Sequence, residues 1–290
     1  VCLDGFAAGC LPANPGDEGF RQAQRLPGAR GILAMNFTLS RWFRPTVPTC
    51  IVCGRDADTR RRPAPLPVRH PAVRAVLRKL CYVCSEAIPW IVSPVCRVCG
   101  RPEVCPDCPR REVRHLLFSR GAVRYDDRMK DWLALYKYRG SEALEPLMAA
   151  MMSYGYERII GELPSIHAVT SVPLARERLE ERGFNQAERM ARTLAEWYGV
   201  PYYALLQRNR HTEKQSLKNR RSRLVDMKGN FVALDPRKLS ALADRHGHPV
   251  RIVLVDDIYT TGSTMNECAG ALEAALPGYA EVYGLMWARS

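Results

Sequence analysis

The sequence predicts an α/β fold in which helices flank a parallel sheet, with a smaller cysteine-rich module before it. Strand-like and helix-like patterns alternate from about residue 116 onward, and four Cys-x-x-Cys pairs gather between residues 50 and 108. At 290 residues the chain exceeds one typical domain. We expect three parts: residues 1–46 as a disordered or extension segment, 47–112 as the cysteine-rich module, and 113–290 as the α/β domain.

The α/β domain shows alternating strand and helix patterns in chain order. Met129, Leu133 and Tyr136 recur at helical spacing, and Gly140 is expected to end their helix. The continuous apolar run at 252–255, rich in β-branched residues, is typical of a strand buried on both faces of a parallel sheet. We expect strands at 116–125, 168–172, 252–255 and near 281–287, and helices near 129–136, 142–156, 185–198 and 264–276.

Two segments lack the periodicity of packed elements. Residues 1–34 are rich in Gly, Ala, Pro and Arg and are expected to be disordered, with Met35 as the natural start of the chain. The basic, proline-rich run from Arg60 to Pro67 interrupts the cysteine-rich module as a surface insertion. This insertion is either a solvated loop or a contact for an acidic partner.

Charge and hydropathy restrict the partners and the compartment. The formal net charge of +13 favours a polyanionic partner, but charge alone does not distinguish DNA, RNA and acidic metabolites. The hydrophobic fraction of 47% permits a substantial core, and no run of about 18 apolar residues suggests a membrane span. No secretory signal is visible, so we expect a cytoplasmic protein whose thiols stay reduced.

Cysteine spacing predicts two structural zinc sites. Eight of the eleven cysteines form four Cys-x-x-Cys pairs, and two such knuckles complete a tetrahedral Zn²⁺ site with no open position. Gly54 and Gly100 directly follow their knuckles and allow a tight backbone turn. Pairing in chain order gives one site from Cys50, Cys53, Cys81 and Cys84, and another from Cys96, Cys99, Cys105 and Cys108.

Other uses of these cysteines stay open. A disulfide framework is one alternative, but reduced thiols are the rule in the cytoplasm. Redox catalysis by a single pair is the other, and four pairs crowded into one region favour metal binding over it. Cys2, Cys10 and Cys268 lack partners, and we expect Cys268 to be a small core residue on the helix at 264–276.

A polar turn follows the apolar strand at 252–255. Asp256 and Asp257 come first, and a hydroxyl-rich turn then opens onto a helix. The turn residues are Thr260, Thr261, Gly262, Ser263 and Thr264. Ligands bind at the carboxyl ends of parallel strands, and a helix start suits a phosphate, whereas two carboxylates need ribose hydroxyls or Mg²⁺. The pattern predicts a phosphosugar site; the alternative is an ordinary helix-capping turn.

The strand, the Asp-Asp pair and the Thr-Thr-Gly turn resemble the phosphoribosyl pyrophosphate (PRPP) motif of type I phosphoribosyltransferases. The resemblance implies that fold, with Asp256 and Asp257 on the ribose 2′- and 3′-hydroxyls, Thr260 to Thr264 around the 5′-phosphate, and Mg²⁺ bound with PRPP. The 6-oxopurine enzymes of this class place a general-base Asp where this chain has Thr260. Hypoxanthine or guanine salvage is therefore not expected.

From about residue 50 to the end, the chain resembles the ComF/GntX family of competence and amidophosphoribosyltransferase-like proteins. The further matching strings are Lys137-Tyr138-Arg139-Gly140, Val172-Pro173-Leu174 with Arg178, Arg182-Gly183-Phe184-Asn185-Gln186, Gln215 with Leu217, Arg223, and Lys228-Gly229-Asn230-Phe231. The family often has Asn where this chain has Asp226. By this resemblance the cysteine-rich module is an N-terminal double zinc ribbon.

The turn from Thr260 to Thr264 is called the phosphate turn. The loop after the strand at 168–172 is expected beside it. Ser171 to Leu174, with Val172 and Pro173 at its centre, is the candidate pyrophosphate loop. Arg178 and Arg182 are candidate catalytic cations that neutralise the pyrophosphate, because guanidinium forks match phosphate oxygens. Both arginines could instead lie on a solvated helix face.

Residues 184–223 contain further candidate functional segments. Phe184 is expected to pack or to function directly, and Asn185 to cap the helix that follows it. Residues 207–223 carry eight basic side chains with little apolar periodicity, so we expect a mobile loop that closes over a reaction centre. Nucleic-acid contact is the rival use of this loop.

Three functions are compatible with these patterns. The first is a phosphoribosyltransferase that displaces pyrophosphate from PRPP with an unassigned nitrogen nucleophile. The second, implied by the ComF resemblance, is a competence factor that binds incoming single-stranded DNA and uses the PRPP site as a sensor; Trp90 is its candidate stacking residue, unless that ring packs on the ribbon. The third is an adaptor whose zinc ribbons dock other proteins of the competence machinery.

Overall fold

The computed structural model describes residues 48–57, 67–138, 143–209 and 229–290. One compact unit spans Thr46–Ser290. The predictions for residues 1–46, for nearly all of the insertion before Pro67, and for Gly140 lie outside the described residues. Most of the predicted loop at 207–223 also lies outside them.

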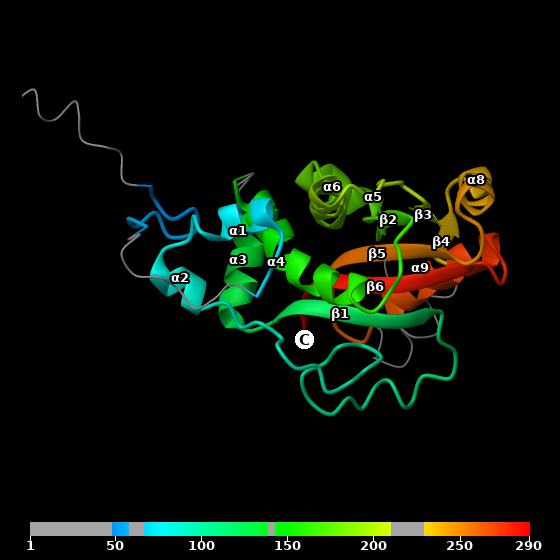
Figure 1. The fold of residues 1–290 in the computed structure, drawn as a ribbon, viewed down its shortest axis with the longest axis horizontal. Coiled ribbons are helices and arrows are strands. Elements are labelled where there is room, and N and C mark those ends of the chain that lie inside the picture. Colours follow the sequence, from blue (N-terminus) through cyan, green and yellow to red (C-terminus); the bar gives the residue numbers. More distant parts are fainter. Residues whose placement is uncertain (1–47, 58–66, 139–142, 210–228) are drawn as a thin grey trace, which may run out of the picture. The chain divides into compact units, whose positions relative to one another are not determined.

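The centre of the fold is a sheet of four parallel strands in the order β1-β6-β5-β2. Its strands are β1 (Leu116–Arg124), β2 (Ala168–Ser171), β5 (Val250–Tyr259) and β6 (Ala280–Arg289). The sequence predicted all four strands, and the α/β class with a parallel sheet is confirmed. Figure 1 shows β1, β6 and β5 side by side in this order.

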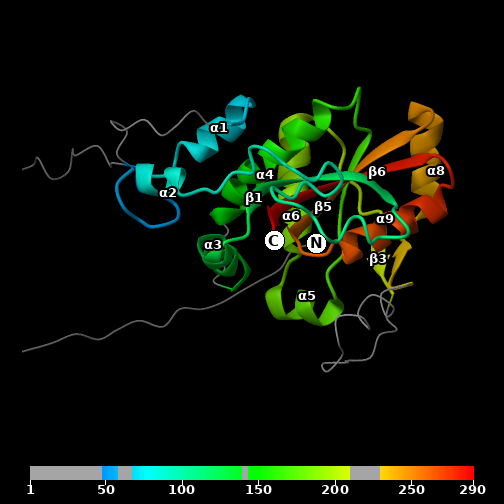
Figure 2. The same ribbon diagram turned by 90° about the horizontal axis from the view of Figure 1, so that it is seen from below.

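Helices cover both faces of this sheet (Figures 1 and 2). The helices α3 (Asp127–Tyr138), α4 (Leu144–Ile160) and α6 (Gln186–Tyr198) contribute to one core, and α8 (Pro236–His246) and α9 (Ser263–Ala275) contribute to the other. Strand β5 alternates between the two cores: Val253 and Val255 belong to the first, Ile252 and Leu254 to the second. This two-sided burial explains the continuous apolar run in the sequence.

Several elements are longer than predicted, and one of these differences matters for the site. Strand β5 does not end at Val255 but continues to Tyr259, so Asp256 and Asp257 lie within the strand. The reason is that β6 also extends and pairs with β5 as far as Tyr259 and Arg289. Apolar periodicity does not detect such an extension, because Asp256 and Asp257 interrupt the apolar run.

The short elements were not predicted. They are α1 (Pro71–Leu77), α2 (Tyr82–Glu86), α5 (Arg176–Arg182) and the antiparallel pair β3 (Leu206–Arg208) and β4 (Phe231–Ala233). The start of the predicted loop is wrong in consequence, since Gln207 and Arg208 belong to β3. Helix α8 was also missed, although its start carries a recognisable signal: Asp235 caps the Arg237 N–H at 3.1 Å and Pro236 follows it.

Within the described ranges, no helix has the length and apolar character needed to cross a bilayer.

Candidate phosphosugar site and cysteine clusters

Strands β2 and β5 end side by side and place predicted site residues at the carboxyl edge of the sheet. Ser171 is aligned with Val255 in the parallel pairing, and the Val172 N–H donates to the Val255 carbonyl at 2.9 Å. The loop that follows β2 therefore begins next to Asp256. The structure brings together the candidate pyrophosphate loop and the Asp-Asp pair.

Asp257 forms an ion pair with a lysine from a different element. Lys137, near the end of α3, places its Nζ 2.5 Å from Asp257 Oδ2, and the two side chains are only 15% and 19% exposed. The Ile258 N–H donates to Asp257 Oδ1 at 2.7 Å. This partial burial makes the pair stronger than an exposed ion pair, because less water screens it.

Asp256 lies in a less favourable electrostatic environment. Burial of its carboxyl group, followed by the negative charge of Asp257, raises the pKa of Asp256 well above its ordinary value. The Asp257 N–H, which donates to Asp256 Oδ1 at 2.8 Å, and the Lys137 charge act in the opposite direction but do not outweigh them. Two carboxylates in this position favour a bound cation, and carboxylate oxygens are ligands that suit Mg²⁺.

The turn between β5 and α9 has a backbone shape that requires glycine. Gly262 has a φ of +77°, and a Cβ here would lie 2.0 Å from the Tyr259 ring. Thr261 Oγ1 and Ser263 Oγ lie 3.0 Å apart, while Asn266 N–H donates the first helical bond to the Gly262 carbonyl at 3.0 Å. The N–H groups before that bond are at the open start of α9, an arrangement that suits an anion.

The other residues of the turn differ in exposure and support. Thr260 is exposed and Thr264 is half-buried. The backbone carbonyls of residues 259–262 accept hydrogen bonds from the guanidinium groups of Arg289 and Arg111. Arg289 also lies over the Tyr259 ring, 4.7 Å from its centroid. Two guanidinium groups therefore hold the backbone of the turn in place.

The candidate pyrophosphate loop is fixed by side chains from α6 and its surroundings. Asn185 Nδ2 donates to the Val172 carbonyl at 3.0 Å, and Asn185 Oδ1 caps α6 by accepting from the Ala187 N–H at 3.1 Å. Ser171 Oγ lies 2.9 Å from Tyr202 Oη. The predicted cap is confirmed, and Asn185 has a second contact that the sequence did not reveal. Pro173, beyond Val172, is half-exposed.

Arg178, Arg182 and Phe184 occupy different environments. Helix α5 contains no buried residue, and Arg178 is exposed on it. Arg182 is half-buried, and its Nη1 donates to Gln186 Oε1 at 2.9 Å. Phe184 packs against Tyr136 at 5.5 Å between ring centroids, so it has a packing role. Of the two arginines, only Arg182 is fixed by a described hydrogen bond to this region.

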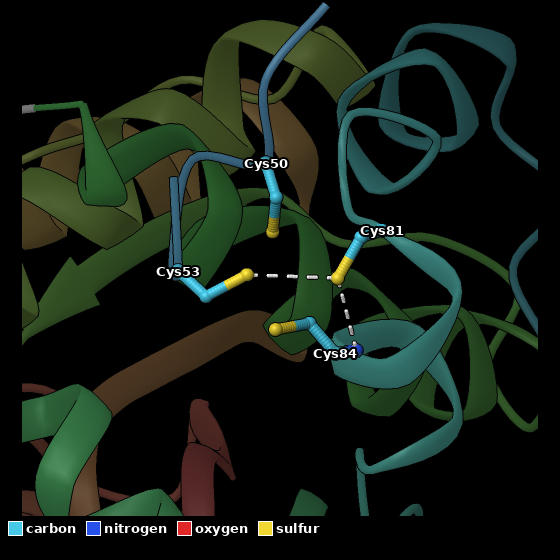
Figure 3. A group of neighbouring side chains, drawn as sticks. All are labelled: Cys50, Cys53, Cys81 and Cys84. Carbon is cyan, nitrogen blue, oxygen red and sulfur yellow. Dashed lines mark hydrogen bonds between the residues drawn. The ribbon is translucent and has the colours of Figure 1, made fainter. Parts of the chain in front are cut away.

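The first cysteine cluster consists of Cys50, Cys53, Cys81 and Cys84, and the pairing in chain order predicted this grouping. Figure 3 shows the four sulfur atoms pointing toward one another, two from the loop at 50–53 and two from the start of α2. Cys53 Sγ and Cys81 Sγ are 3.6 Å apart. Gly54 follows this knuckle with a φ of +69°, as the sequence predicted.

The second cysteine cluster consists of Cys96, Cys99, Cys105 and Cys108, again as predicted. Cys99 Sγ and Cys105 Sγ are 3.5 Å apart. Around a tetrahedral zinc with Zn–S bonds of about 2.3 Å, neighbouring sulfurs lie about 3.8 Å apart, so both clusters fit the ion. Bound zinc would cross-link the two knuckles of each cluster. Cys268 is fully buried in the core, which confirms its prediction.

Each cluster contains a thiol with a lowered pKa and a thiol with a raised pKa. Burial alone would raise the pKa of Cys50, but hydrogen bonds from nearby backbone N–H groups outweigh it and lower the pKa to about 7. The pKa of Cys105 is lowered to about 7 in the same way. Burial raises the pKa of Cys84 and of Cys108, and neighbouring sulfurs add to the effect. A dication would favour the thiolate form of all four, as zinc ligation requires.

Sequence reasoning missed three residues that contact the candidate phosphosugar site. Lys137 lies within a string that matched the family, but only the structure shows its contact with Asp257. Arg111 and Arg289 carried no signal, because nothing near them in the sequence indicates contact with a turn about 150 and 29 residues away. A search for basic residues just after the last knuckle would have found Arg111 among several others.

Comparison with known proteins gives a consistent set of relatives. Competence protein ComFC of Bacillus subtilis (strain 168) is 33% identical over 204 residues, which cover 67% of this chain and 78% of that protein. Competence protein F of Haemophilus influenzae is 32% identical, covering 71% and 89%. DNA utilization protein YhgH of Escherichia coli (strain K12) is 33% identical, covering 67% and 90%.

Other comparisons add little. No family model matches the chain. A solved glutamine PRPP amidotransferase from B. subtilis, complexed with ADP and GMP, aligns with a TM-score of 0.25 and 20% identity over 41% of this chain and 22% of that one, too weakly to support an argument. The curated relatives are sufficient by themselves, because at about one-third identity they align along most of their own length. The chain belongs to the ComF family.

Proposed function

We propose that the chain binds PRPP together with Mg²⁺ at the carboxyl ends of β2 and β5. The observation that carries this proposal is the pair of adjacent carboxylates, Asp256 and Asp257, placed between a helix-start turn and the loop after β2. A phosphate at the turn and a hydroxyl-bearing sugar at the carboxylates would satisfy both groups. Neither a phosphate ion alone nor a neutral sugar alone would do so.

Each part of the site then has a role. Asp256 and Asp257 accept hydrogen bonds from the ribose 2′- and 3′-hydroxyls, and the turn from Thr260 to Thr264 holds the 5′-phosphate. The loop from Ser171 to Leu174, with Val172 and Pro173, receives the pyrophosphate. Bound Mg²⁺ would neutralise pyrophosphate oxygens. Arg182 is held by its hydrogen bond to Gln186, next to Asn185, which contacts this loop, whereas Arg178 is exposed.

The reaction that fits these roles is phosphoribosyl transfer to an acceptor not yet assigned. A nitrogen nucleophile forms a bond to ribose C1, the bond from C1 to the pyrophosphate oxygen breaks, and its electron pair leaves with the pyrophosphate. The chain contributes orientation of the ribose and stabilisation of the leaving group. Thr260, where 6-oxopurine enzymes have an Asp, argues for an acceptor other than hypoxanthine or guanine.

Calorimetric titration of PRPP with Mg²⁺ into the zinc-loaded protein tests this proposal. We expect wild-type protein to bind and the double variant Asp256→Ala/Asp257→Ala to lose measurable binding. Asp131→Ala, at an exposed carboxylate on α3, is the matched control and should bind as wild type does. Absence of heat with wild-type protein would contradict both the transferase and any sensor role of the site.

In the cell, the proposed role is in DNA uptake during natural competence. The relatives bear the names competence protein and DNA utilization protein. A second candidate function, favoured by the net charge of +13, is direct binding of single-stranded DNA with the PRPP site as a sensor. Trp90 does not support stacking on DNA bases, because its ring packs edge-on against Tyr154 of α4 at 5.4 Å.

Salt dependence separates the two candidates. If the chain binds single-stranded DNA through its basic surface, the affinity for an oligonucleotide should fall steeply between 50 and 200 mM salt, because bound counterions are released. Binding that is absent, or that does not change with salt, would remove the second candidate. Partner proteins that remain bound to an Asp257→Ala variant would instead favour an adaptor built on the cysteine clusters.

A further inference from the structure

Two arginines hold the backbone of the phosphate turn. Arg289 Nη1 donates to the carbonyls of Tyr259 at 2.9 Å and Thr260 at 2.8 Å. Arg111 donates through Nη1 to the Gly262 carbonyl at 3.2 Å and through Nη2 to the Thr261 carbonyl. Four consecutive carbonyls are thus fixed by two guanidinium groups.

Fixing these carbonyls also orients the amides of the turn. In a planar trans peptide, the N–H points opposite to the carbonyl of the same peptide unit. The N–H groups of residues 260–263 are therefore turned away from the two arginines. Loss of either arginine would free peptide units to rotate, and a phosphate held by several N–H groups needs them to converge.

Both arginines are attached to the second cysteine cluster. Arg289 is 2% exposed, and its Nη2 lies 3.6 Å from Cys99 Sγ as a hydrogen-bond donor. Arg111 comes three residues after Cys108, and its own N–H donates to the Cys108 carbonyl at 3.3 Å. Arg289 therefore contacts the side chain of Cys99, a predicted metal ligand. Arg111 is held by the backbone of Cys108, which is another predicted ligand.

The second cluster is itself fixed on the sheet. The Ser119 N–H of β1 donates to the Val98 carbonyl at 2.6 Å, inside the knuckle from Cys96 to Cys99. Arg120 Nη1, also from β1, donates to the Arg97 carbonyl at 3.0 Å. Strand β1 thus anchors one knuckle, and both arginines contact the cluster. The cluster therefore connects the sheet to the turn.

We propose that Arg111 and Arg289 are positioning residues that make the shape of the phosphate turn depend on closure of the second cysteine cluster. Metal that holds Cys99 and Cys108 in place also holds the two guanidinium groups, and hence the amides that face the phosphate. Loss of that metal loosens the turn and weakens binding of a phosphosugar. The ligand side of this inference rests on the proposed function, whereas the effect on the free turn does not.

Hydrogen exchange on the zinc-loaded full chain, measured by mass spectrometry on peptides that include residues 259–264, tests the support without any ligand. In Arg111→Ala we expect these amides to exchange about tenfold faster, with a melting temperature lowered by only a few degrees, so that the protein remains folded. Arg111→Lys, which keeps one charged donor, should restore part of the protection. Arg114→Ala is the matched control. Arg114 Nη2 also donates to the cluster, at the Cys108 carbonyl (3.0 Å), but none of its described hydrogen bonds reaches the turn.

A second measurement is the affinity of each variant for PRPP with Mg²⁺. Arg111→Ala should bind about tenfold more weakly, a change of about 1.4 kcal/mol, and Arg114→Ala should bind as wild type does. Equal exchange at residues 259–264 in wild type and Arg111→Ala would overturn the inference, as would equal loss in Arg114→Ala. If wild type does not bind PRPP but Arg111→Ala loosens the turn, the proposed function is wrong, whereas the positioning role of Arg111 is confirmed.

Discussion

The two cysteine clusters share a ligand set but have different neighbours. The first is connected to α4: Glu157 accepts hydrogen bonds from the Arg69 and His70 N–H groups, just before α1 leads to Cys81. The second is bonded to β1, and Arg289 connects it to the backbone of the turn that follows β5. Within the described residues, no hydrogen bond joins the first cluster to that turn. The comparison teaches that a cluster's role follows from its attachments, not from its four thiols.

The largest expected effect is on the attachment of the first cluster. Glu157 accepts from Arg69 N–H at 2.8 Å, from His70 N–H at 2.9 Å and from the Tyr198 hydroxyl at 2.8 Å. Glu157→Ala leaves these donors without their charged acceptor, so we expect the free energy of unfolding to fall by about 3 kcal/mol. Chemical denaturation followed by tryptophan fluorescence measures this change.

Two further results make this prediction specific. Tyr198→Phe removes one of the donors to Glu157 and should cost about 1 kcal/mol. Affinity for PRPP should stay within twofold of wild type in both variants, because the first cluster does not support the turn. A large loss of PRPP affinity in Glu157→Ala would show that the two clusters are not separate in function.

Removing ligands from each cluster compares the two directly. In Cys105→Ser/Cys108→Ser, we expect PRPP with Mg²⁺ to bind about thirtyfold more weakly, equivalent to about 2 kcal/mol, because Arg111 and Arg289 lose their support. The matched variant Cys50→Ser/Cys53→Ser should lose one equivalent of zinc and keep its affinity. Calorimetry and metal analysis on the same samples measure both. Equal weakening in the two variants would mean that zinc acts only through general stability.

The parts of this molecule that the sequence predicted depend on short-range patterns. Cys-x-x-Cys spacing fixes which thiols form a knuckle, so the two clusters could be grouped before the structure was known. An apolar run followed by Asp256, Asp257 and a Thr-Thr-Gly turn similarly indicated a strand and the start of a helix. Within each knuckle and within the Asp-Asp turn, the residues that act together are near one another in the chain.

The parts that were missed depend on contacts between distant residues. Arg289 contacts a cysteine 190 positions earlier, and Lys137 of α3 contacts Asp257 of β5. Periodicity says which face of an element is buried, but not which charged side chain ends at a particular carbonyl or carboxylate. The extension of β5 to Tyr259 has the same origin, because it depends on the pairing partner that β6 supplies.

Lys137 contacts the candidate site through a carboxylate, whereas the two arginines contact backbone carbonyls. Lys137→Met removes the cation 2.5 Å from Asp257 Oδ2 while keeping most of the side-chain volume. We expect the free energy of unfolding at neutral pH to fall by about 1.5 kcal/mol, because a half-buried carboxylate loses its partner. Saturating Mg²⁺ should restore part of this loss in thermal unfolding experiments. Exposed Lys130→Met, on the same helix, is the control.

The smallest expected effect concerns Asp256, and its size depends on pH. Burial and the charge of Asp257 raise the pKa of Asp256 in the folded protein, whereas in the unfolded chain it titrates near its ordinary value of about 4. The folded state therefore holds the proton more tightly. Wild-type stability falls as pH rises from about 4 through the raised pKa, because the unfolded chain ionises first.

Asparagine cannot ionise, so Asp256→Asn should escape this loss. We expect the variant to be more stable than wild type by about 1 kcal/mol at pH 8, with the difference shrinking as the pH is lowered toward 5. Melting temperatures across that range measure it, and Asp131→Asn on the exposed face of α3 should show no such trend. A stability difference that does not change with pH would mean that Asp256 does not hold its proton, and that the site accepts both negative charges without a bound cation.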